Sequence, residues 1–436
     1  MTPFEIGLAA LAGMGGLVFL GMHVPMALMA VSFLGVWAIK GTPLLAANLL
    51  TLAANDAISS YFFGVVPLFV LMGFLVSEAG LGRDAYDVAN RAFGRMRGGL
   101  GVGTVGANAI FAAITGISIA SAAVFTRIAV PEMVRHGYTP RFAVGVVAGS
   151  SVLGMLIPPS LLLILYGILA EQSIGDLFIA GIGPGLVLAV LFGAGIVAMA
   201  TFMPGFVGRP TRAEVAMPWP EVLAKAGPIA GLIALVLGGI YGGIFTPVEA
   251  GAVGALVALA IGVARGRLRA RQIATVLVET GLVTAAVCFL IIAAQIYARM
   301  LALSGVPRGL ADLAAGAELG LWGVLALYVV VLVALGMILD SSSILLIVVP
   351  LMLPVMAPFG VDLVWFGIVT IIAVEIGLLT PPFGLSVYVI KSTLEDPAIG
   401  LGDIFRGALP FAAIMLAALA LLLAFPVIAT GLLPGR

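Results

Sequence analysis

The stretch Gly149-Ser-Ser-Val-Leu-Gly-Met-Leu-Ile-Pro158-Pro159-Ser160 decides how the rest of the chain is organised. Two adjacent prolines in an apolar run interrupt a helix that is otherwise committed to the membrane, because proline has no backbone N–H to donate. The pattern returns at Val374-Glu-Ile-Gly377-Leu-Leu-Thr-Pro381-Pro382-Phe-Gly384, and the spacing from Pro158 to Pro381 is 223 residues. The chain therefore contains two corresponding broken helices.

Other glycines and prolines recur at nearly the same period. The pairs Gly154/Gly377 and Pro131/Pro354 are 223 residues apart, and the pairs Gly21/Gly243 and Pro25/Pro247 are 222 apart. Residues that recur at one period across half the chain indicate an internal duplication. A broken helix at a corresponding place in each half is the best sequence indication of a secondary transporter's binding site.

Composition sets the class of protein. Of the 436 residues, 62% are hydrophobic and 9% are charged, and the mean hydropathy is +1.26. These values exclude an ordinary soluble globule and indicate an all-α polytopic membrane protein. The zero net charge does not favour nucleic-acid binding, and the single cysteine, Cys288, excludes a disulfide within the chain. The apolar N-terminus lacks a basic segment and a cleavage site, so we expect a first span and not a signal peptide.

Apolar runs define the expected elements of each half. Before the first hairpin we expect spans at 4–22, 25–40 and 64–80, an interfacial segment at 42–63 and a surface helix at 82–98. A re-entrant hairpin with limbs 100–116 and 119–134 precedes the broken helix 141–157 and 160–171. Further spans follow at 175–203, 226–244, 248–264 and 279–303. A second hairpin, 320–338 and 344–357, precedes the broken helix 362–378 and 383–391 and a last span at 404–428.

Arginine and lysine placement orients these ten crossings and two hairpins, because cytoplasmic loops carry the excess of positive charge. With the N-terminus in the periplasm, three of these residues lie outside: Lys40, Arg308 and Arg436. Fifteen lie on the cytoplasmic side: Arg83, Arg91, Arg95, Arg97, Arg135, Arg141, Arg209, Arg212, Lys225, Arg265, Arg267, Arg269, Arg271, Lys391 and Arg406. Five crossings separate the hairpins, and this odd number inverts the second repeat relative to the first.

The repeats predict six segments of different roles. Scaffold helices and an amphipathic arm occupy 1–99, the first hairpin and broken helix 100–172, and a linking span with a cytoplasmic loop 173–225. The second scaffold occupies 226–318, the second hairpin and broken helix 319–391, and the C-terminal span 392–436. The two hairpin segments form the expected transport domain.

Interrupted helices leave carbonyls and amides unpaired, and inside a membrane these groups need an ion, a substrate or water. Carbonyl and hydroxyl oxygens suit a hard cation such as Na⁺, and helix N-termini suit a carboxylate. The expected Na⁺ ligands are Thr115, Gly116, Ser118, Ser121, Gly154 and Pro158 in one cluster, and Asp340, Ser341, Ser342, Ser343, Gly377, Thr380 and Pro381 in its inverted mate. The expected substrate contacts are Ser118, Ser160, Ser342, Pro159 and Pro382. Each of these hydroxyls could instead donate a hydrogen bond to a backbone carbonyl of its own helix.

Three charged residues at membrane depth have two interpretations each. Asp340 either adds charge to a cation site or caps the second limb of its hairpin. Glu375 is either structural, paired with a donor on a neighbouring helix, or a proton carrier. Arg127 lies nine residues beyond Ser118, about 13 Å along a helix, which favours snorkelling to the cytoplasmic face over substrate contact.

Four motifs carry a family resemblance. They are Ile128-Ala-Val-Pro131-Glu132-Met133-Val-Arg-His-Gly137-Tyr138, Leu156-Ile-Pro158-Pro159-Ser160 with Tyr166-Gly167, Gly336-Met-Ile-Leu-Asp340-Ser-Ser-Ser, and Gly377-Leu-Leu-Thr380-Pro381-Pro382-Phe-Gly384-Leu. With them the whole chain resembles the large membrane subunit of tripartite ATP-independent periplasmic (TRAP) transporters of the dicarboxylate type, within the ion transporter superfamily. The resemblance implies Na⁺-driven import of an organic acid across the bacterial inner membrane by an elevator. It also implies two partners, a small four-helix membrane subunit and a periplasmic substrate-binding protein.

Other functions agree less well with the sequence. A self-sufficient Na⁺- or H⁺-coupled carboxylate symporter or exchanger of the same superfamily would share the topology and need no partner. An intramembrane enzyme is disfavoured because the sequence has no His-Glu-x-x-His and no Ser/His pairing at membrane depth. A passive channel is disfavoured by the inverted hairpins. We therefore expect a transporter and not an enzyme.

Overall fold

The computed structural model describes residues 1–209, 217–316, 320–394 and 396–433. Within these residues the secondary structure is helical, apart from turns and one isolated bridge between Tyr138 and Gly208. Helices suit a membrane because each backbone amide finds its carbonyl within the same segment. The all-α class is therefore confirmed. Two residues of the charge count, Arg212 and Arg436, lie outside the described residues.

Ten α-helices form the first half of the chain. They are α1 (Pro3–Phe19), α2 (Val24–Lys40), α3 (Pro43–Ser59), α4 (Val65–Glu78), α5 (Leu81–Phe93), α6 (Gly99–Thr115), α7 (Ser118–Arg135), α8 (Pro140–Ser151), α9 (Leu153–Leu156) and α10 (Leu161–Ala170), with a 3₁₀ turn η1 (Tyr61–Gly64) before α4. The expected first hairpin is the pair α6 and α7. The expected broken helix is α8 and α9 followed by α10, with a bend of 41° at the break.

The long helix α11 (Ile174–Phe202) links the two halves. After it come α12 (Pro204–Val207), α13 (Trp219–Tyr241), α14 (Pro247–Ala264), α15 (Ala270–Ser304), α16 (Val306–Gly316), α17 (Gly320–Gly336), α18 (Ser341–Met356), η2 (Ala357–Phe359), α19 (Leu363–Leu378), α20 (Leu385–Thr393), α21 (Leu401–Ala424) and α22 (Val427–Thr430). The second hairpin is α17 and α18, and the second broken helix is α19 and α20. α16 was not expected from the sequence, and α15 begins nine residues earlier than the predicted span at 279.

Local sequence signals explain where many helices begin. Thr139 and Ser160 place a side-chain oxygen on the first free backbone amides of α8 and α10, and Asp362 does the same for α19. Thr246 and Glu249 form a reciprocal capping box at the start of α14, where Pro247 occupies the first helical position. These caps satisfy amides that no membrane lipid can satisfy.

Length and apolar composition test the count of membrane crossings only in part. Six helices of the described residues are long and apolar enough to cross a membrane, or up to eight if each of two bent pairs is one span. Helices α1, α2, α6, α17 and α19 are apolar but have 17 residues or fewer. The ten crossings therefore stay a prediction.

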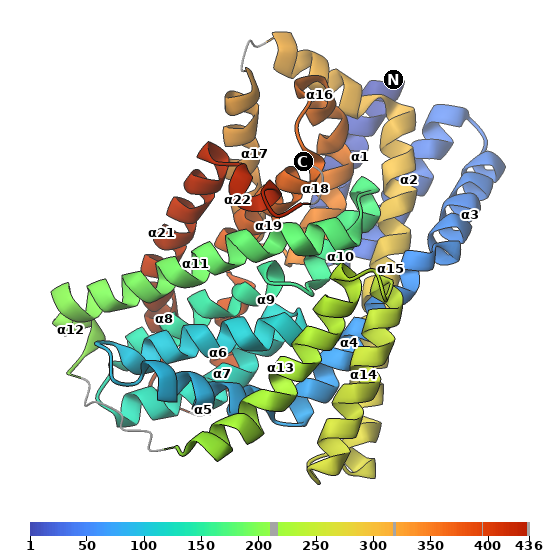
Figure 1. Ribbon diagram of the computed structural model, residues 1–436. Coiled ribbons are helices and arrows are strands. Elements are labelled where there is room, and N and C mark those ends of the chain that lie inside the picture. The colour runs from blue at the N-terminus through green and yellow to red at the C-terminus, as the bar shows by residue number, and fades with distance from the viewer. Residues whose placement is uncertain (210–216, 317–319, 395, 434–436) are drawn as a thin grey trace.

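The broken helix of each half packs on the hairpin of the other half (Figure 1). α10 of the first half packs on the hairpin limb α18 of the second, and α20 of the second half packs on the hairpin limb α7 of the first. Likewise α4 packs on α14, and α15 packs on α2. α11 runs between the two hairpins and contacts α6, α10 and α19.

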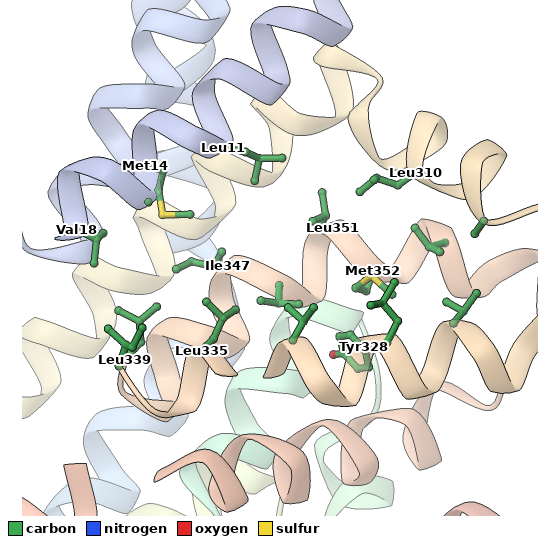
Figure 2. Close-up of a pocket in the computed structure, with 18 of the residues that line it drawn as sticks. Leu11, Met14, Val18, Leu310, Tyr328, Leu335, Leu339, Ile347, Leu351 and Met352 are labelled. Carbon is green, nitrogen blue, oxygen red and sulfur yellow. The ribbon is translucent and has the colours of Figure 1, made fainter. Parts of the chain in front are cut away.

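A large apolar cavity of about 820 Å³ lies between α1, α16 and the second hairpin (Figure 2). Its walls carry Leu11 and Met14 of α1, Leu335 of α17, and Ile347 and Leu351 of α18. α16 also packs directly on α18, so α1 and α16 cover the second hairpin only in part.

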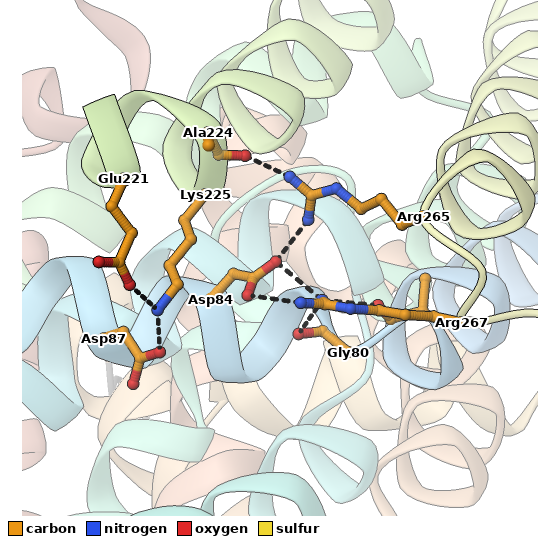
Figure 3. A network of polar contacts seen from close by, with 9 residues as sticks. Gly80, Asp84, Asp87, Glu221, Ala224, Lys225, Arg265 and Arg267 are labelled. Carbon is orange, nitrogen blue, oxygen red and sulfur yellow. Dashed lines mark hydrogen bonds and ion pairs between the residues drawn. The ribbon is translucent and has the colours of Figure 1, made fainter. Parts of the chain in front are cut away.

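A polar clamp holds α5 to α13 and to the turn after α14 (Figure 3). Asp84 of α5, only 3% exposed, accepts hydrogen bonds from Arg265 at 2.5 Å and from Arg267 at 2.9 Å. Lys225 of α13 lies 2.7 Å from Asp87 of α5. The two guanidinium groups neutralise the charge of the buried Asp84 carboxylate. The clamp therefore joins α5 to α13 and to the turn after α14.

Candidate functional site

The first hairpin turns at Gly116 and Ile117, between α6 and α7. Gly116 has a backbone φ of +65°, a region that side chains other than glycine rarely adopt. A Cβ at Gly116 would also overlap the carbonyl oxygen of Pro159. The Thr115 hydroxyl bonds back to the carbonyl of Phe111 at 2.9 Å. The tip is therefore a tight turn pressed against the Pro-Pro break.

The first break and the first tip are joined through their backbones. The amide of Leu161 donates to the carbonyl of Gly116 at 3.0 Å. A Cβ on Gly154 would lie 3.2 Å from backbone atoms of Ile117 and Ser118, so Gly154 permits this close approach. The structure thus brings together the predicted residues Gly116, Gly154 and Ser118.

A small cavity of about 10 Å³ lies where tip and break meet. Thr115, Gly116 and Ile117 line one side, Pro159 and Ser160 line the other, and Phe69 and Val70 of α4 close it. This volume is about what one water molecule needs, so the cavity is of the size of a small ion. Pro158, Pro159 and Ser160 are all buried, and the Ser160 hydroxyl donates to the carbonyl of Met155 at 2.5 Å.

Two hydroxyls beside this tip have no hydrogen-bond partner. Ser118 and Ser121 are fully buried, and neither Oγ atom has a partner among the described residues. Three residues apart on α7, they lie on one face of that helix. Buried hydroxyls usually bond to the carbonyl of the preceding turn, as Thr115 and Thr126 do here, so the Oγ atoms of Ser118 and Ser121 keep lone pairs free for a ligand. Other buried hydroxyls of the described residues are in the same state, among them Ser32, Thr280 and Ser386, and what distinguishes this pair is its place beside the tip.

The second tip differs from the first because the side chains of Asp340, Ser341 and Ser343 already have hydrogen-bond partners. Asp340 caps α18: its carboxylate accepts the amide of Ser343 at 3.0 Å and also the Ser343 hydroxyl. Ser341 donates to Glu375 of α19 at 2.6 Å. Of the two interpretations of Asp340 the structure shows the cap, and for Glu375 it shows the pairing with a donor on a neighbouring helix.

Glu375 is the most buried carboxylate of this region. It is 0% exposed, and its Oε2 atom has no hydrogen-bond partner among the described residues. Thr380 bonds back to the carbonyls of Ile376 and Gly377, at 2.8 and 2.9 Å, and Ser342 is half-buried. A carboxylate with one free oxygen at membrane depth calls for a cation or a proton.

The second break is joined to its tip as the first is. The amide of Gly384 donates to the carbonyl of Met337 at 3.3 Å, and a Cβ on Gly377 would lie 2.6 Å from Cα of Gly336. Leu161 and Gly384, the two donors, are 223 residues apart, which is the period of the repeat. Pro381 and Pro382 are exposed, in contrast to the prolines of the first break. Both Pro-Pro peptide bonds are cis.

Sequence reasoning missed two members of this region. Asn108 of α6 donates to the Ser150 hydroxyl of α8 at 2.7 Å, and both residues are fully buried. An asparagine within an apolar limb is a signal that could have been used. Met337 contributes only its carbonyl, and no side-chain pattern indicates that role.

Comparison with known proteins identifies the family. The profile described as "Tripartite ATP-independent periplasmic transporter, DctM component" matches residues 11–428. The C4-dicarboxylate TRAP transporter large permease protein DctM of Pseudomonas aeruginosa is 33% identical over 85% of this chain and 86% of its own length. The sialic acid TRAP transporter large permease protein SiaM of Vibrio cholerae is 31% identical over 94% of both.

A solved structure supports the fold. The MtrF protein of Neisseria gonorrhoeae, described as illuminating a class of antimetabolite efflux pumps, superposes with a TM-score of 0.61 at 14% identity, covering 87% of this chain and 84% of its own. At this identity the likeness concerns the fold alone. The family profile and the relatives cover the hairpins, the breaks and the scaffold alike, so this chain belongs to the large permease components of tripartite ATP-independent periplasmic transporters, which are multi-pass inner-membrane transport proteins and not enzymes.

Proposed function

We propose that this chain imports an organic acid in symport with Na⁺. The observation that carries the proposal is the pair of buried, unpartnered hydroxyls of Ser118 and Ser121 beside the tip at Gly116. Oxygen atoms of hydroxyls and carbonyls are the ligands that hard cations prefer. A cavity of about 10 Å³ at the same tip has the volume of one small ion, although Ser118 and Ser121 do not line it.

A second Na⁺ site is proposed at the other tip. The hydroxyl and carbonyl oxygens there belong to Ser341, Ser342, Gly377 and Thr380. Glu375, which accepts a hydrogen bond from Ser341, adds a buried negative charge beside them. In a low-dielectric interior a cation near Glu375 would offset the cost of its charge. Glu375 thus supports the second site more directly than Asp340, whose carboxylate is engaged in the helix cap.

We propose a carboxylate as the substrate because helix N-termini favour negative charge and those of α7, α10 and α20 flank the tips and breaks. The start of α18 already holds the carboxylate of Asp340. The relatives are named for C4-dicarboxylates and for sialic acid. Of the expected contacts, Ser342 and Pro382 are accessible in this conformation, whereas Ser118, Pro159 and Ser160 are buried.

The movement we propose is an elevator with inverted repeats. Residues 100–172 and 319–391 would move as one block, since α10 packs on α18 and α20 on α7. The apolar cavity of Figure 2 leaves part of the second hairpin without contact to α1, which lowers the cost of sliding, although α16 packs on α18. The N-terminus would lie in the periplasm, as the positive charges predict.

Two partners complete the proposed transporter. They are a small four-helix membrane subunit and a periplasmic substrate-binding protein. The family description, which calls the transporter tripartite, supports both.

The test is uptake into proteoliposomes that contain this chain and the small subunit encoded beside it. Radiolabelled succinate and sialic acid are supplied with and without the neighbouring binding protein, across an imposed Na⁺ gradient or a matched K⁺ gradient. We expect uptake that requires both Na⁺ and the binding protein. Uptake that is indifferent to Na⁺ in the presence of all three proteins would contradict the cation sites.

A self-sufficient Na⁺- or H⁺-coupled symporter or exchanger is the alternative. The Oε2 atom of Glu375, which has no hydrogen-bond partner among the described residues, favours the H⁺-coupled form of this alternative, since a buried carboxylate can carry a proton. Uptake by this chain alone, driven by a pH gradient and abolished in Glu375→Gln, would establish that alternative.

A further inference from the structure

A polar pocket of about 450 Å³ lies between the arm helix α5 and the hairpin limb α7, away from both tips. We call it the arm pocket. Arg83, Tyr86, Asp87 and Asn90 line it from α5, and Arg127 and Glu132 line it from α7. The pocket therefore joins a helix clamped to the scaffold with a helix of the first hairpin.

The carboxylates of the arm pocket already have cationic partners. Lys225 lies 2.7 Å from Asp87, as Figure 3 shows, and also 3.0 Å from Glu221. Arg135, at the rim, lies 3.2 Å from Glu132. Both acidic side chains of the pocket are thus neutralised.

Two guanidinium groups of the same pocket have no such partner. Arg83 and Arg127 form no ion pair and no side-chain hydrogen bond with any described residue. They come from different helices and line one pocket. Both side chains are exposed, so water solvates their charge and their N–H donors stay available to a ligand. Guanidinium groups bind planar or tetrahedral oxyanions through paired N–H donors.

A buried polar group of the same pocket gives a second, independent observation. Tyr86 is 3% exposed, and its hydroxyl faces the side chains of Asn90 and Thr104 without forming a hydrogen bond of normal geometry with either. Asn90, one turn along α5, does not point its Oδ1 atom into the pocket, because that atom lies against Gly103 of α6, where an added Cβ would overlap it. A buried hydroxyl is rarely left without a hydrogen bond, so a ligand that accepts one from Tyr86 accounts for its state.

We propose that the arm pocket binds a phosphate group, held by Arg83 and Arg127 with the Tyr86 hydroxyl as a further donor. Two guanidinium groups offer paired N–H donors to the oxygens of a phosphate, which carries one negative charge as a phosphodiester and up to two as the free ion, and the bound anion would tie α5 to α7. Two sources share this chemistry. One is the headgroup of an anionic phospholipid, within reach of side chains at the membrane surface, and the other is free inorganic phosphate.

The first experiment separates these sources. The full chain, purified with the subunits that accompany it, is melted in detergent with increasing inorganic phosphate against chloride at equal ionic strength. It is then melted in lipid nanodiscs of phosphatidylglycerol and of phosphatidylcholine. A higher Tm with inorganic phosphate identifies the free anion as a ligand, and a higher Tm in phosphatidylglycerol alone identifies the headgroup.

Variants tie the effect to the pocket. We expect Arg83→Gln and Arg127→Gln each to weaken the phosphate effect about tenfold, because each removes a charged donor. Arg271→Gln is the matched control, since Arg271 is an exposed arginine outside the pocket, and it should retain the full effect. Tyr86→Phe should leave the Tm of the ligand-free protein unchanged, because the hydroxyl has no partner to lose, while weakening phosphate binding.

The proposal is overturned by either of two results. One is the absence of stabilisation by both phosphate and phosphatidylglycerol. The other is a stabilisation that persists undiminished in Arg83→Gln, Arg127→Gln and Tyr86→Phe. Neither result depends on Na⁺ coupling, so these experiments test phosphate binding in the arm pocket independently of the proposed transport function.

Discussion

The two Pro-Pro breaks arise from one sequence pattern and yet differ in their surroundings. Ser160, which follows the first pair of prolines, is 0% exposed, whereas Phe383, which follows the second pair at the same position of the repeat, is 52% exposed. Beside the first break lie two hydroxyls without partners. At the second, Ser341 and Ser343 are bonded to carboxylates and Thr380 to its own helix.

The difference teaches that neighbours, not the motif, decide how a break is covered. Gly181 of α11 lies so close to the first break that a Cβ there would be 2.5 Å from the carbonyl of Leu156. The position 223 residues later is Ile404 of α21, and α21 approaches Gly384 of the second break with the side chain of Phe405. The first break is therefore sealed by α11, while the second stays accessible.

The largest expected effect concerns this accessibility. In a Cys288→Ala background we expect Phe383→Cys to react with a small water-soluble thiol reagent about a hundredfold faster than Ser160→Cys, because a buried site reacts only after local opening. Reaction rates of the two purified variants, followed by mass spectrometry, measure the ratio. Equal reaction rates in the folded protein would show that the two breaks do not differ in their exposure to water.

Next in size is the effect of Gly116→Ala. The substitution places a side chain in a left-handed conformation, at a cost of about 1–2 kcal/mol, and drives it into the Pro159 carbonyl. Gly305→Ala is the matched control, because Gly305 has a φ of +73° and nothing within 4 Å of the added Cβ. We expect Gly116→Ala to lower the free energy of unfolding by about 2 kcal/mol more than the control, in line with the cost of overpacking. Denaturant unfolding of both variants measures this, and equal losses would show that the first tip is not closely packed.

A smaller loss is expected from Ser341→Ala at the second tip. The substitution removes the one hydrogen bond of buried Glu375, and an unsatisfied buried acceptor costs about 1–3 kcal/mol. Ser342→Ala is the control, since the half-buried Ser342 makes no such bond, and it should lose less than about 0.5 kcal/mol. Unfolding in the absence of Na⁺ compares them. If both variants are equally stable, the Ser341–Glu375 bond does not contribute to the fold.

The smallest change in ligand-free stability is expected from Ser118→Ala at the first tip. Its hydroxyl has no partner to lose, so we expect a change within about 0.5 kcal/mol without Na⁺, but about tenfold weaker stabilisation by Na⁺. Thr126→Ala is the control, because its hydroxyl only bonds back to Ala122 and should leave the Na⁺ effect unchanged. Melting curves over a Na⁺ titration provide both quantities. A Ser118→Ala protein with full Na⁺ stabilisation would remove Ser118 from the cation site.

Much of the fold was predictable because membrane segments obey strong local rules. The limbs of both hairpins, predicted at 100–116 and 119–134 and at 320–338 and 344–357, agree with α6, α7, α17 and α18 to within a few residues. Two adjacent prolines end a helix where single prolines such as Pro131 and Pro184 do not, so the breaks after Leu156 and Leu378 were also predicted. The helix α16 was missed because its 11 residues are too few and too polar for a span.

The candidate site was predictable only as a set of residues. Gly116, Gly154 and Ser118 do meet, as do Gly377 and Gly336, because small residues permit the close approach of backbones. The partners of individual hydroxyls were not predictable. Thr115 and Thr380 bond back to their helices, Ser341 bonds across to α19, and Ser118 to nothing described.

The sequence by itself determined the class of protein and the position of both breaks, because hydropathy and the lack of an N–H in proline act locally. Only the tertiary structure decided which break is covered, which hydroxyls keep free lone pairs and which arginines share the arm pocket. Those properties depend on helices far apart in the chain, such as α11 over the first break and α7 beside α5, whose approach is set by packing and not by any one segment.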